Sequence, residues 1–459
     1  MLKDLTVGKE SKLILLFALP MLLGNVFQQL YNIIDSIIVG QYLGKEALAA
    51  VGASFPVIFV LISLIIGISS GSTIIISQYF GAKQYDNVKR AIDTMFIMLF
   101  FASLAITFIG IAFSHTIFNL MKLPAEIMDS AILFFNIIIS GVILLFGFNG
   151  TSAVLRGLGD SKTPLYFLII STILNIILVI LFIVVFKWGI AGAAIATLIS
   201  QGVSFALAVI YLNKYYTIIK FSFRNIVFDK DIFNKSLKIG IPSGLQQTFV
   251  AIGMMALMRI VSDFGTNTIA AYTVAGRIDS FAAMPAMNFS MALSTFVGQN
   301  IGANKIDRVR KGYVATLWMT GILSVIVTLS VYFFGGQMMS LFTYDPEVIR
   351  IGKSYLIIVS SFYILFSFMF ANNGVMRGAG DTLIPMFITL FSLWLLRIPF
   401  SYIISARIGS DGIWWSIPLA WFFGCLLSYI YYKTGRWKRK AVIKHPIIEE
   451  MTIVEQLPD

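Results

Sequence analysis

Residues 155–160 read Leu-Arg-Gly-Leu-Gly-Asp, and residues 376–381, 221 positions later, read Met-Arg-Gly-Ala-Gly-Asp. The same offset relates Gln-Tyr-Phe-Gly-Ala-Lys at 78–83 to Gln-Asn-Ile-Gly-Ala-Asn at 299–304. A constant offset over two separate motifs indicates that the chain consists of two related halves. In each half the glycines permit a tight turn, and the aspartate that follows can cap the next helix or pair with the arginine. We therefore interpret the Arg-Gly-x-Gly-Asp stretches as rigid hairpins rather than substrate contacts.

The composition assigns both halves to the membrane. The chain has 459 residues, of which 58% are hydrophobic and 12% charged, whereas soluble domains carry about 25% charged residues. One cysteine, Cys425, excludes an intrachain disulfide, and two distant histidines, His115 and His445, argue against a histidine metal site. These numbers exclude an ordinary soluble enzyme.

Long apolar runs separated by polar turns predict an all-α polytopic protein with twelve transmembrane helices. Six helices separate the two copies of each motif, so both copies have the same orientation in the membrane. The repeat is therefore parallel, with two six-helix bundles related by an axis along the membrane normal, as in some secondary transporters. The predicted spans are 13–39, 50–78, 92–114, 127–151, 164–186, 190–212, 236–261, 268–297, 312–334, 348–371, 383–405 and 412–432.

We divide the chain at its polar middle segment. Residues 1–212 form the predicted N-terminal lobe, 213–235 a cytoplasmic linker, 236–435 the C-terminal lobe and 436–459 a cytoplasmic tail. Two lobes with a central cleft suit transport by alternating access. Because two lobes already form a complete pathway, we expect a monomer.

The basic residues orient the chain in the membrane. Of its 34 Lys and Arg, 25 fall in the N-terminus, the even-numbered loops and the tail, six in the odd-numbered loops and three inside predicted helices. This bias places both termini in the cytoplasm and the protein in the plasma (inner) membrane. The net charge of +12 therefore reflects topology in the lipid bilayer, and no nucleic-acid partner is expected.

The first predicted helix carries a polar stripe. Asp35 is preceded by Asn32, Tyr31 and Gln28 at three, four and seven residues, which places all four on one helix face. A charged side chain inside a bilayer costs at least ~2.5–3.5 kcal/mol, so it needs a reason. Such a stripe is typical of a helix that lines a water-filled cavity. The alternative is an Asp fixed by hydrogen bonds for helix packing; we favour a functional role, since Ser or Asn would suffice for packing.

The C-terminal half holds four further intramembrane charges: Arg259, Arg277, Asp279 and Arg397. Asp279 and Arg277 are two residues apart and so lie on different helix faces. Asp279 could pair with Arg397 or Arg259 on another helix. We favour such a structural ion pair over a second titrating site.

The residues quoted above, together with the order Pro20, Gln28-Gln29, Tyr31-Asn32 and Asp35, resemble the multidrug and toxic compound extrusion (MATE) transporters. The resemblance covers residues 10 to 435. It implies a V-shaped antiporter of twelve helices that expels organic, often cationic, compounds against an inward flow of protons or sodium. A bend of the first helix at Pro20 would serve as a hinge, because proline removes a helix hydrogen bond.

Within this family the chain most resembles the DinF-like subfamily. There an Asp fifteen residues after the helix-1 Pro carries the coupling ion, and Asp35 stands at that position. The resemblance adds Asn175 and Thr197 to the ion site and assigns Gln28, Tyr31 and Asn32 to the substrate cavity. It also implies a second Asp four residues after Asn175, where this chain has Val179.

Val179 affects the choice of coupling ion. Sodium needs several oxygen ligands, and the missing carboxylate removes both ligands and charge. A single carboxyl group among neutral neighbours can instead carry a proton, because burial favours its neutral form. We therefore favour protons over sodium, although backbone carbonyls or water could complete a sodium site at Asp35. No other metal and no organic cofactor is expected.

The sequence predicts an ion-coupled multidrug exporter, not an enzyme. A flippase for lipids or lipid-linked glycans is the alternative, because related transporters share the two-lobe design. A membrane-embedded transferase is the third possibility, but it would need a cluster of acids, His or Ser near one face, whereas Asp35 and Asp279 lie in separate halves. No Gly-x-x-x-x-Gly-Lys-Ser/Thr cradle is present, which excludes an ATP-driven pump within this chain.

Overall fold

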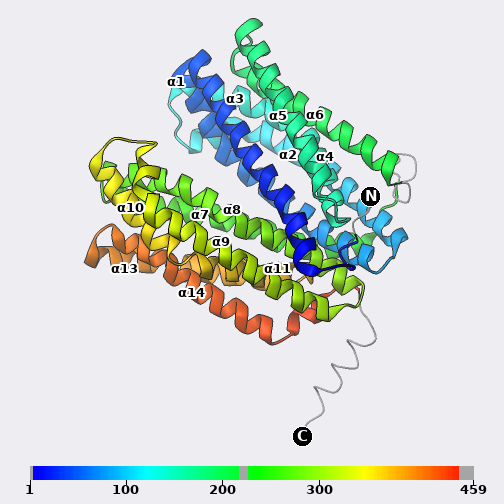
Figure 1. Ribbon diagram of the computed structural model, residues 1–459. Helices are drawn as coiled ribbons and strands as arrows, with labels where there is room; N and C mark the ends of the chain where they lie inside the picture. Colours follow the sequence, from blue (N-terminus) through cyan, green and yellow to red (C-terminus); the bar gives the residue numbers. More distant parts are fainter. Residues whose placement is uncertain (1–3, 217–225, 444–459) are drawn as a thin grey trace. The chain divides into compact units, whose positions relative to one another are not determined.

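The computed structural model describes residues 4–216 and 226–443, and all regular secondary structure in these ranges is helical (Figure 1). Parts of the predicted linker (217–225) and tail (444–459) lie outside the described residues. The α-helices are α1 (Glu10–Gly81), α2 (Tyr85–Leu120), α3 (Ala125–Ser140), α4 (Val142–Gly157), α5 (Lys162–Ile180), α6 (Gly189–Tyr215), α7 (Lys230–Ser262), α8 (Thr266–Gly302), α9 (Ile306–Ser340), α10 (Pro346–Ser360), α11 (Tyr363–Gly378), α12 (Leu383–Leu390), α13 (Ile398–Ile408) and α14 (Asp411–Lys433). Two π-helical segments, η1 (Leu181–Val185) and η3 (Phe391–Arg397), and the 3₁₀ helix η4 (Arg436–Lys440) complete the list.

The helices account for the twelve predicted spans. In the described chain, eight helices are long and apolar enough to cross a membrane, or up to ten when each bent pair counts as one span. α1 contains two predicted spans, separated at Gly44, whose φ of 84° interrupts the helix. α8, 37 residues long, is the remaining span and is less apolar than the others. The protein is therefore a multi-pass helical membrane protein.

Two spans are broken at equivalent places in the repeat. α3 and α4 meet at Gly141 with a bend of 50°, and α10 and α11 meet at residues 361–362 with the same bend. A broken helix exposes main-chain polar groups, which the membrane interior tolerates only where protein or water covers them. These breaks were not predicted from hydropathy, which reads each pair as one apolar run.

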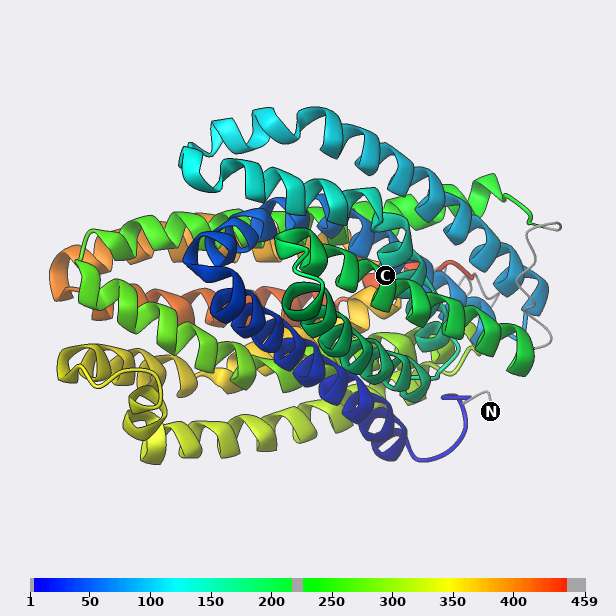
Figure 2. The same ribbon diagram turned by 90° about the horizontal axis from the view of Figure 1, so that it is seen from above.

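The chain forms two compact units. The first comprises Met1–Asp4 and Leu19–Gly244, and the second comprises Leu5–Ala18 and Leu245–Asp459. In the first unit α6 packs against α3, α4 and α5, and α2 and α3 run beside each other as a hairpin, drawn in blue to cyan in Figure 2. Its core is apolar: Phe118 and Phe135 are fully buried there with their rings edge to face.

The second unit is built around α8, α9, α10, α11 and α14, which pack against one another. Its core combines aliphatic and aromatic side chains, and Trp414 is its largest fully buried member. Trp414 stacks on Tyr272 and meets Tyr355 edge to face. Aromatic pairs in these arrangements add to the gain from burial alone.

Small residues let α1 and α7 approach closely within the first unit. A Cβ atom on Gly71 would lie 2.7 Å from the main-chain oxygen of Ser236, and one on Gly240 would lie 2.7 Å from Cα of Ile68. Gly67 faces the main chain of Gly240 and Gly244 in the same way. This is the small-x-x-x-small packing common between membrane helices, and the sequence analysis did not identify it.

The Arg-Gly-x-Gly-Asp stretches form the rigid turns that the sequence predicts. Their second glycines, Gly159 and Gly380, have φ of 86° and 94°, which other residues rarely adopt. The aspartate after the first turn caps the next helix, as predicted: Asp160 Oδ1 accepts from the main-chain N–H of Lys162 and Thr163 at 3.1 Å.

Asp160 also accepts a hydrogen bond from the hydroxyl of Tyr216, at 3.1 Å. Burial and the neighbouring Asp160 raise the pKa of Tyr216, so this hydroxyl remains a donor at neutral pH. The turn is thereby tied to the end of α6.

Candidate functional site

Two of the predicted ion-site residues of the first unit, Asn175 and Thr197, share a hydrogen-bond network with Tyr31, which was predicted for the substrate cavity. Tyr31 Oη, from α1, lies 3.1 Å from Thr197 Oγ1, and Asn175 Nδ2, from α5, donates to the same oxygen at 3.4 Å. Thr197 itself donates to the main-chain oxygen of Ala193 at 3.1 Å. Three helices thus share one network.

Asp35 lies one turn beyond Tyr31 on α1 and is half-buried. The carboxylate interacts electrostatically with Tyr31. Its Oδ1 atom is enclosed and has no hydrogen-bond partner among the described residues. A buried oxygen without a partner is costly unless a proton, an ion or water satisfies it.

The other predicted residues of α1 lie nearby on the helix. Gln28 and Asn32, assigned by resemblance to the substrate cavity, are half-buried. Pro20, the predicted hinge, is buried inside α1. It lies two residues after Ala18, where the chain passes from the second compact unit to the first. Pro242 in α7 lies two residues before the other such boundary.

Val179 is fully buried in the core of the first unit, together with Phe182 and Ile183. It faces apolar neighbours, so no second carboxylate complements Asp35 from this position. The described residues contain no group of three or more His, Cys, Asp or Glu side chains that could hold a metal ion. The donor set around Asp35 is therefore one carboxyl group with neutral hydroxyl and amide groups.

The charges of the second unit have partners that the sequence analysis did not anticipate. Asp279, on α8, accepts hydrogen bonds on both carboxylate oxygens, from Tyr363 Oη at 2.5 Å and from Tyr355 Oη at 3.3 Å. Among the described residues no ion pair within 4 Å joins Asp279 to Arg259, Arg277 or Arg397. The close ion pair that we favoured from the sequence is thus absent, because tyrosine hydroxyls satisfy the carboxylate instead.

The three arginines also differ from one another. Arg259 and Arg277 are exposed on the protein surface, contrary to the expectation of buried charges, whereas Arg397 is half-buried. Arg397 acts electrostatically on Asp279, and its Nε has no hydrogen-bond partner in the described chain. The two tyrosines could have been found from the sequence only by knowing which helices pack against α8.

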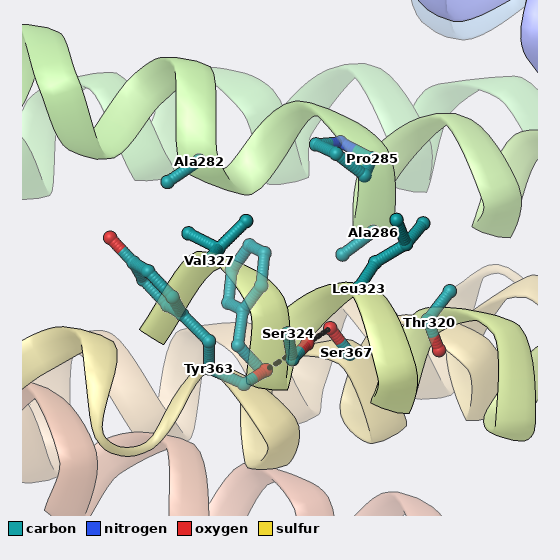
Figure 3. Close-up of a pocket in the computed structure, with 10 residues that line it drawn as sticks. Ala282, Pro285, Ala286, Thr320, Leu323, Ser324, Val327, Tyr363 and Ser367 are labelled. Carbon is teal, nitrogen blue, oxygen red and sulfur yellow. Dashed lines mark hydrogen bonds between the residues drawn. The ribbon is translucent and has the colours of Figure 1, made fainter. Parts of the chain in front are cut away.

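A small cavity lies beside this cluster, within the second unit (Figure 3). Its volume of about 10 Å³ is on the order of the space that one water molecule needs. Ala282, Ser324, Ser367 and the ring of Tyr363 are among its lining residues. Ser324 Oγ lies 2.7 Å from Ser367 Oγ and donates to the main-chain oxygen of Tyr363 at 3.4 Å.

Comparison with known proteins supports the resemblance seen in the residues. The model of the MatE family matches this chain twice, over residues 20–181 and 242–403. These two matches correspond to the two halves of the repeat. They include the helices that carry Asp35, Asn175, Asp279 and Arg397.

The chain is also similar to individual relatives and to solved structures. The chain is 34% identical to the "Probable multidrug resistance protein YpnP" of Bacillus subtilis (strain 168), over 95% of this chain and 97% of that one. It is 27% identical to the "Probable multidrug resistance protein NorM" of Thermotoga maritima, over 97% of both chains. A solved structure described as "MATE in the bent conformation" aligns with a TM-score of 0.89 at 25% identity, covering 96% of this chain and 98% of that chain.

Proposed function

The chain belongs to the MatE family of membrane transporters, and we propose that it is a secondary antiporter that exports organic, often cationic, compounds in exchange for inward protons. The names of its relatives, which refer to multidrug resistance, support this class of substrate. Transport proceeds by alternating access. The chain works in the plasma membrane as a monomer with both termini in the cytoplasm, consistent with its excess of basic residues in alternate loops.

The observation that carries the proposal is the state of Asp35. It is an ionisable group on a membrane helix, half-buried, with an enclosed oxygen that no group in the described part of the chain satisfies. Intramembrane carboxyl groups of this kind mark proton and ion pathways in transporters. Asp35 therefore acts as the coupling carboxyl group, and Tyr31, Asn175 and Thr197 hold its surroundings in place.

The same network favours a proton over sodium. The Thr197 hydroxyl donates a hydrogen bond to Ala193 and accepts hydrogen bonds from Tyr31 and Asn175. Both lone pairs of its oxygen are therefore already used. Val179 replaces the carboxylate that the DinF-like subfamily would add. A proton needs one acceptor oxygen, whereas sodium needs several oxygen ligands, and Asp35 is the one carboxylate among these side chains. Gln28, Tyr31 and Asn32 contribute to the substrate cavity, and Pro20 is the hinge of α1.

The experiment compares wild type with Asp35→Asn in liposomes, using a fluorescent cationic dye and an imposed proton gradient, then a sodium gradient. Asn keeps the size and polarity of the side chain but cannot carry a proton. We expect the proton gradient to drive dye movement in wild type, and Asp35→Asn to bind dye but to lose gradient-driven movement by about 100-fold, in the range of a lost essential proton-transfer group.

Asp129→Asn is the matched control, because Asp129 is an exposed acid on α3 of the same unit; we expect it to transport like wild type. Normal transport by Asp35→Asn would refute the assignment of the coupling group. Transport driven by sodium alone would refute proton coupling. If neither gradient moves the dye but a labelled lipid crosses the bilayer, the protein is a flippase.

A further inference from the structure

We propose that Asp279 is a second proton-binding site of the transporter, separate from Asp35 and located in the second compact unit. This inference rests on the proposed function as a proton-coupled antiporter and extends it. One O–H bond forms when the carboxylate takes up a proton from one side of the membrane. The same bond breaks when the proton is released on the other side. The proton gradient supplies all that the step consumes.

The first support is the depth of the cluster in the membrane. Asp279 is 13 residues from the start of α8, and Tyr355 is nine residues from the start of α10, which at ~1.5 Å per residue places them roughly 20 and 14 Å from the outer ends of these helices. The cluster thus lies near the middle of the bilayer. Retaining a charge there is costly and is uncommon without a functional reason.

The second support is the local backbone, which is irregular on several sides of the cluster. Tyr363 is the first residue of α11, directly after the 50° break from α10. Arg397 is the last residue of the π-helical segment η3, and Pro285, which cannot donate a main-chain hydrogen bond, lies inside α8 six residues after Asp279. Broken membrane helices and π-helical segments are frequent at ion and substrate sites.

The groups that face Asp279 leave it able to change charge. α10 contributes Tyr355, α11 contributes Tyr363, and η3 contributes Arg397, which interacts with Asp279 from beyond ion-pair distance. At this level α9 offers Val327 and Ser324, neither of which titrates. The two hydroxyls stabilise the carboxylate, and after protonation one of them can turn and accept a hydrogen bond from it.

Buried hydroxyl groups lie beside the cluster. Tyr363, whose hydroxyl donates to Asp279, lines the cavity together with Ser324 and Ser367 (Figure 3). Thr320 also lines the cavity, and Thr316 lies one helical turn further along α9; both are buried. Hydroxyl groups and a water molecule of this kind can pass a proton by exchanging hydrogen bonds.

Further buried polar groups lie nearer the end of the unit that the charge distribution places in the cytoplasm. There Tyr313 Oη donates to Asn372 Oδ1 at 2.7 Å, and Asn372 Nδ2 donates to Ser428 Oγ at 2.9 Å. In the first half of the repeat, the positions equivalent to Thr316 and Thr320 are Met95 and Leu99. The scaffold therefore does not itself require hydroxyls at these places.

The first experiment measures how many protons accompany one substrate. The membrane potential of the vesicles is clamped at zero, and a pH gradient of about one unit is imposed. The measured quantity is the limiting ratio of the dye concentrations on the two sides of the membrane. One proton per dye supports about a tenfold ratio, and two protons support about 100-fold. We expect about 100-fold in wild type and about tenfold in Asp279→Asn.

Two pairs of variants separate proton binding from structural damage. Tyr363→Phe removes one donor to the carboxylate, so transport should reach half its maximum at a higher pH; Tyr431→Phe, which removes the 2.6 Å hydrogen bond to Asp381 in the same unit, should leave the pH profile unchanged. Ser324→Ala with Ser367→Ala should slow transport, whereas Ser401→Ala with Ser416→Ala, a buried hydroxyl pair elsewhere in this unit, should not.

A limiting ratio of about tenfold in wild type, or an equal ratio in wild type and Asp279→Asn, would overturn the inference while leaving the proposed function intact. If wild type moves no dye under any gradient, the proposed function fails instead. The inference is then decided by infrared spectroscopy of the purified full-length protein. Lowering the pH of Asp35→Asn should produce a carboxylic-acid C=O band that is missing when Asp279→Asn is added; an identical spectrum would overturn it.

Discussion

The polar sites of the two units occupy different positions in the repeat. In the first unit the cluster is carried by α1, α5 and α6, and in the second by α8, α10, α11 and η3. The equivalents of the first cluster, 221 residues on, are apolar: Ala256 for Asp35, Leu396 for Asn175 and Pro418 for Thr197. The equivalents of the second are apolar too: Ile58 for Asp279, Phe134 for Tyr355, Val142 for Tyr363 and Ile176 for Arg397.

The scaffold, in contrast, is repeated closely. Both units contain a 50° break in the same span. Lys83 and Asn304, at equivalent positions in the Gln-x-x-Gly-Ala loops, have φ of 59° and 57°, and Gly159 and Gly380 have matching positive φ. The duplication thus preserved turns and bends, whereas the charged chemistry differs in each half. We conclude that the two units share a fold but carry their charged groups at different positions in it.

Overpacking the contact between α1 and α7 should give the largest effect. Gly240→Leu would drive side-chain atoms into the main chain of α1, and we expect destabilisation of about 3 kcal/mol or more. Thermal unfolding in detergent measures it. Gly52→Leu, on α1 of the same unit, is the control, because nothing lies within 4 Å of its Cβ position. Equal unfolding temperatures for the two variants would show that this close approach is unimportant.

A smaller effect should separate the two Arg-Gly-x-Gly-Asp turns. Asp160 accepts four hydrogen bonds, from the N–H groups of Lys162 and Thr163, from Thr163 Oγ1 and from Tyr216 Oη. In the described structure Asp381 accepts one, from Tyr431. We expect Asp160→Ala to cost about 2 kcal/mol and Asp381→Ala about 1 kcal/mol. Chemical denaturation measures the free energy of unfolding of both variants. A larger loss for Asp381→Ala than for Asp160→Ala would contradict the prediction.

The smallest effect concerns two arginines near the ends of the units. Arg308 contacts Glu10 at 3.0 Å and also donates to the main-chain oxygens of Leu5 and Gly8. Arg90 lies 3.6 Å from Asp229, and its side chain is 55% exposed. We expect Arg308→Ala to raise amide exchange in residues 5–10 about fivefold, equivalent to about 1 kcal/mol.

Arg90→Ala should change amide exchange in residues 226–229 very little, because exposed ion pairs contribute about 0–1 kcal/mol. Hydrogen exchange followed by mass spectrometry resolves both segments in one sample. Comparable increases of amide exchange in the two segments would mean that the solvent exposure of an arginine does not determine how much its contacts stabilise the chain.

The helical architecture could be predicted because it depends on apolar runs of sufficient length and on an exact sequence offset. The irregularities within it could not. The bends at Gly141 and at residues 361–362 interrupt no apolar run, and η1 and η3 have the composition of ordinary membrane helices. The turn at residues 155–160 was predicted correctly because glycine and aspartate have strong local preferences.

Within the sites, the predicted ion-site residues Asn175 and Thr197 are joined by a hydrogen bond, and Tyr31, predicted for the substrate cavity, bonds to the same Thr197. The prediction for Asp279 was wrong, because the search for a partner considered only opposite charges. Tyr355 and Tyr363 belong to the apolar core of their unit, and a buried tyrosine gives no sign in the sequence of where its hydroxyl points. The glycine contacts of α1 with α7 were missed for a related reason, since they depend on which helices pack together.

The position of Leu5–Ala18 in the second unit has a consequence for how the chain is made. Leu5 donates its N–H to Gln299, and its carbonyl accepts from Arg308, 303 residues further along. A ribosome that adds roughly 5–20 residues per second needs roughly 15–60 s to cover that distance. During this interval residues 5–18 have none of these partners, so they can take their place in the second unit only after the segment around Arg308 has been made.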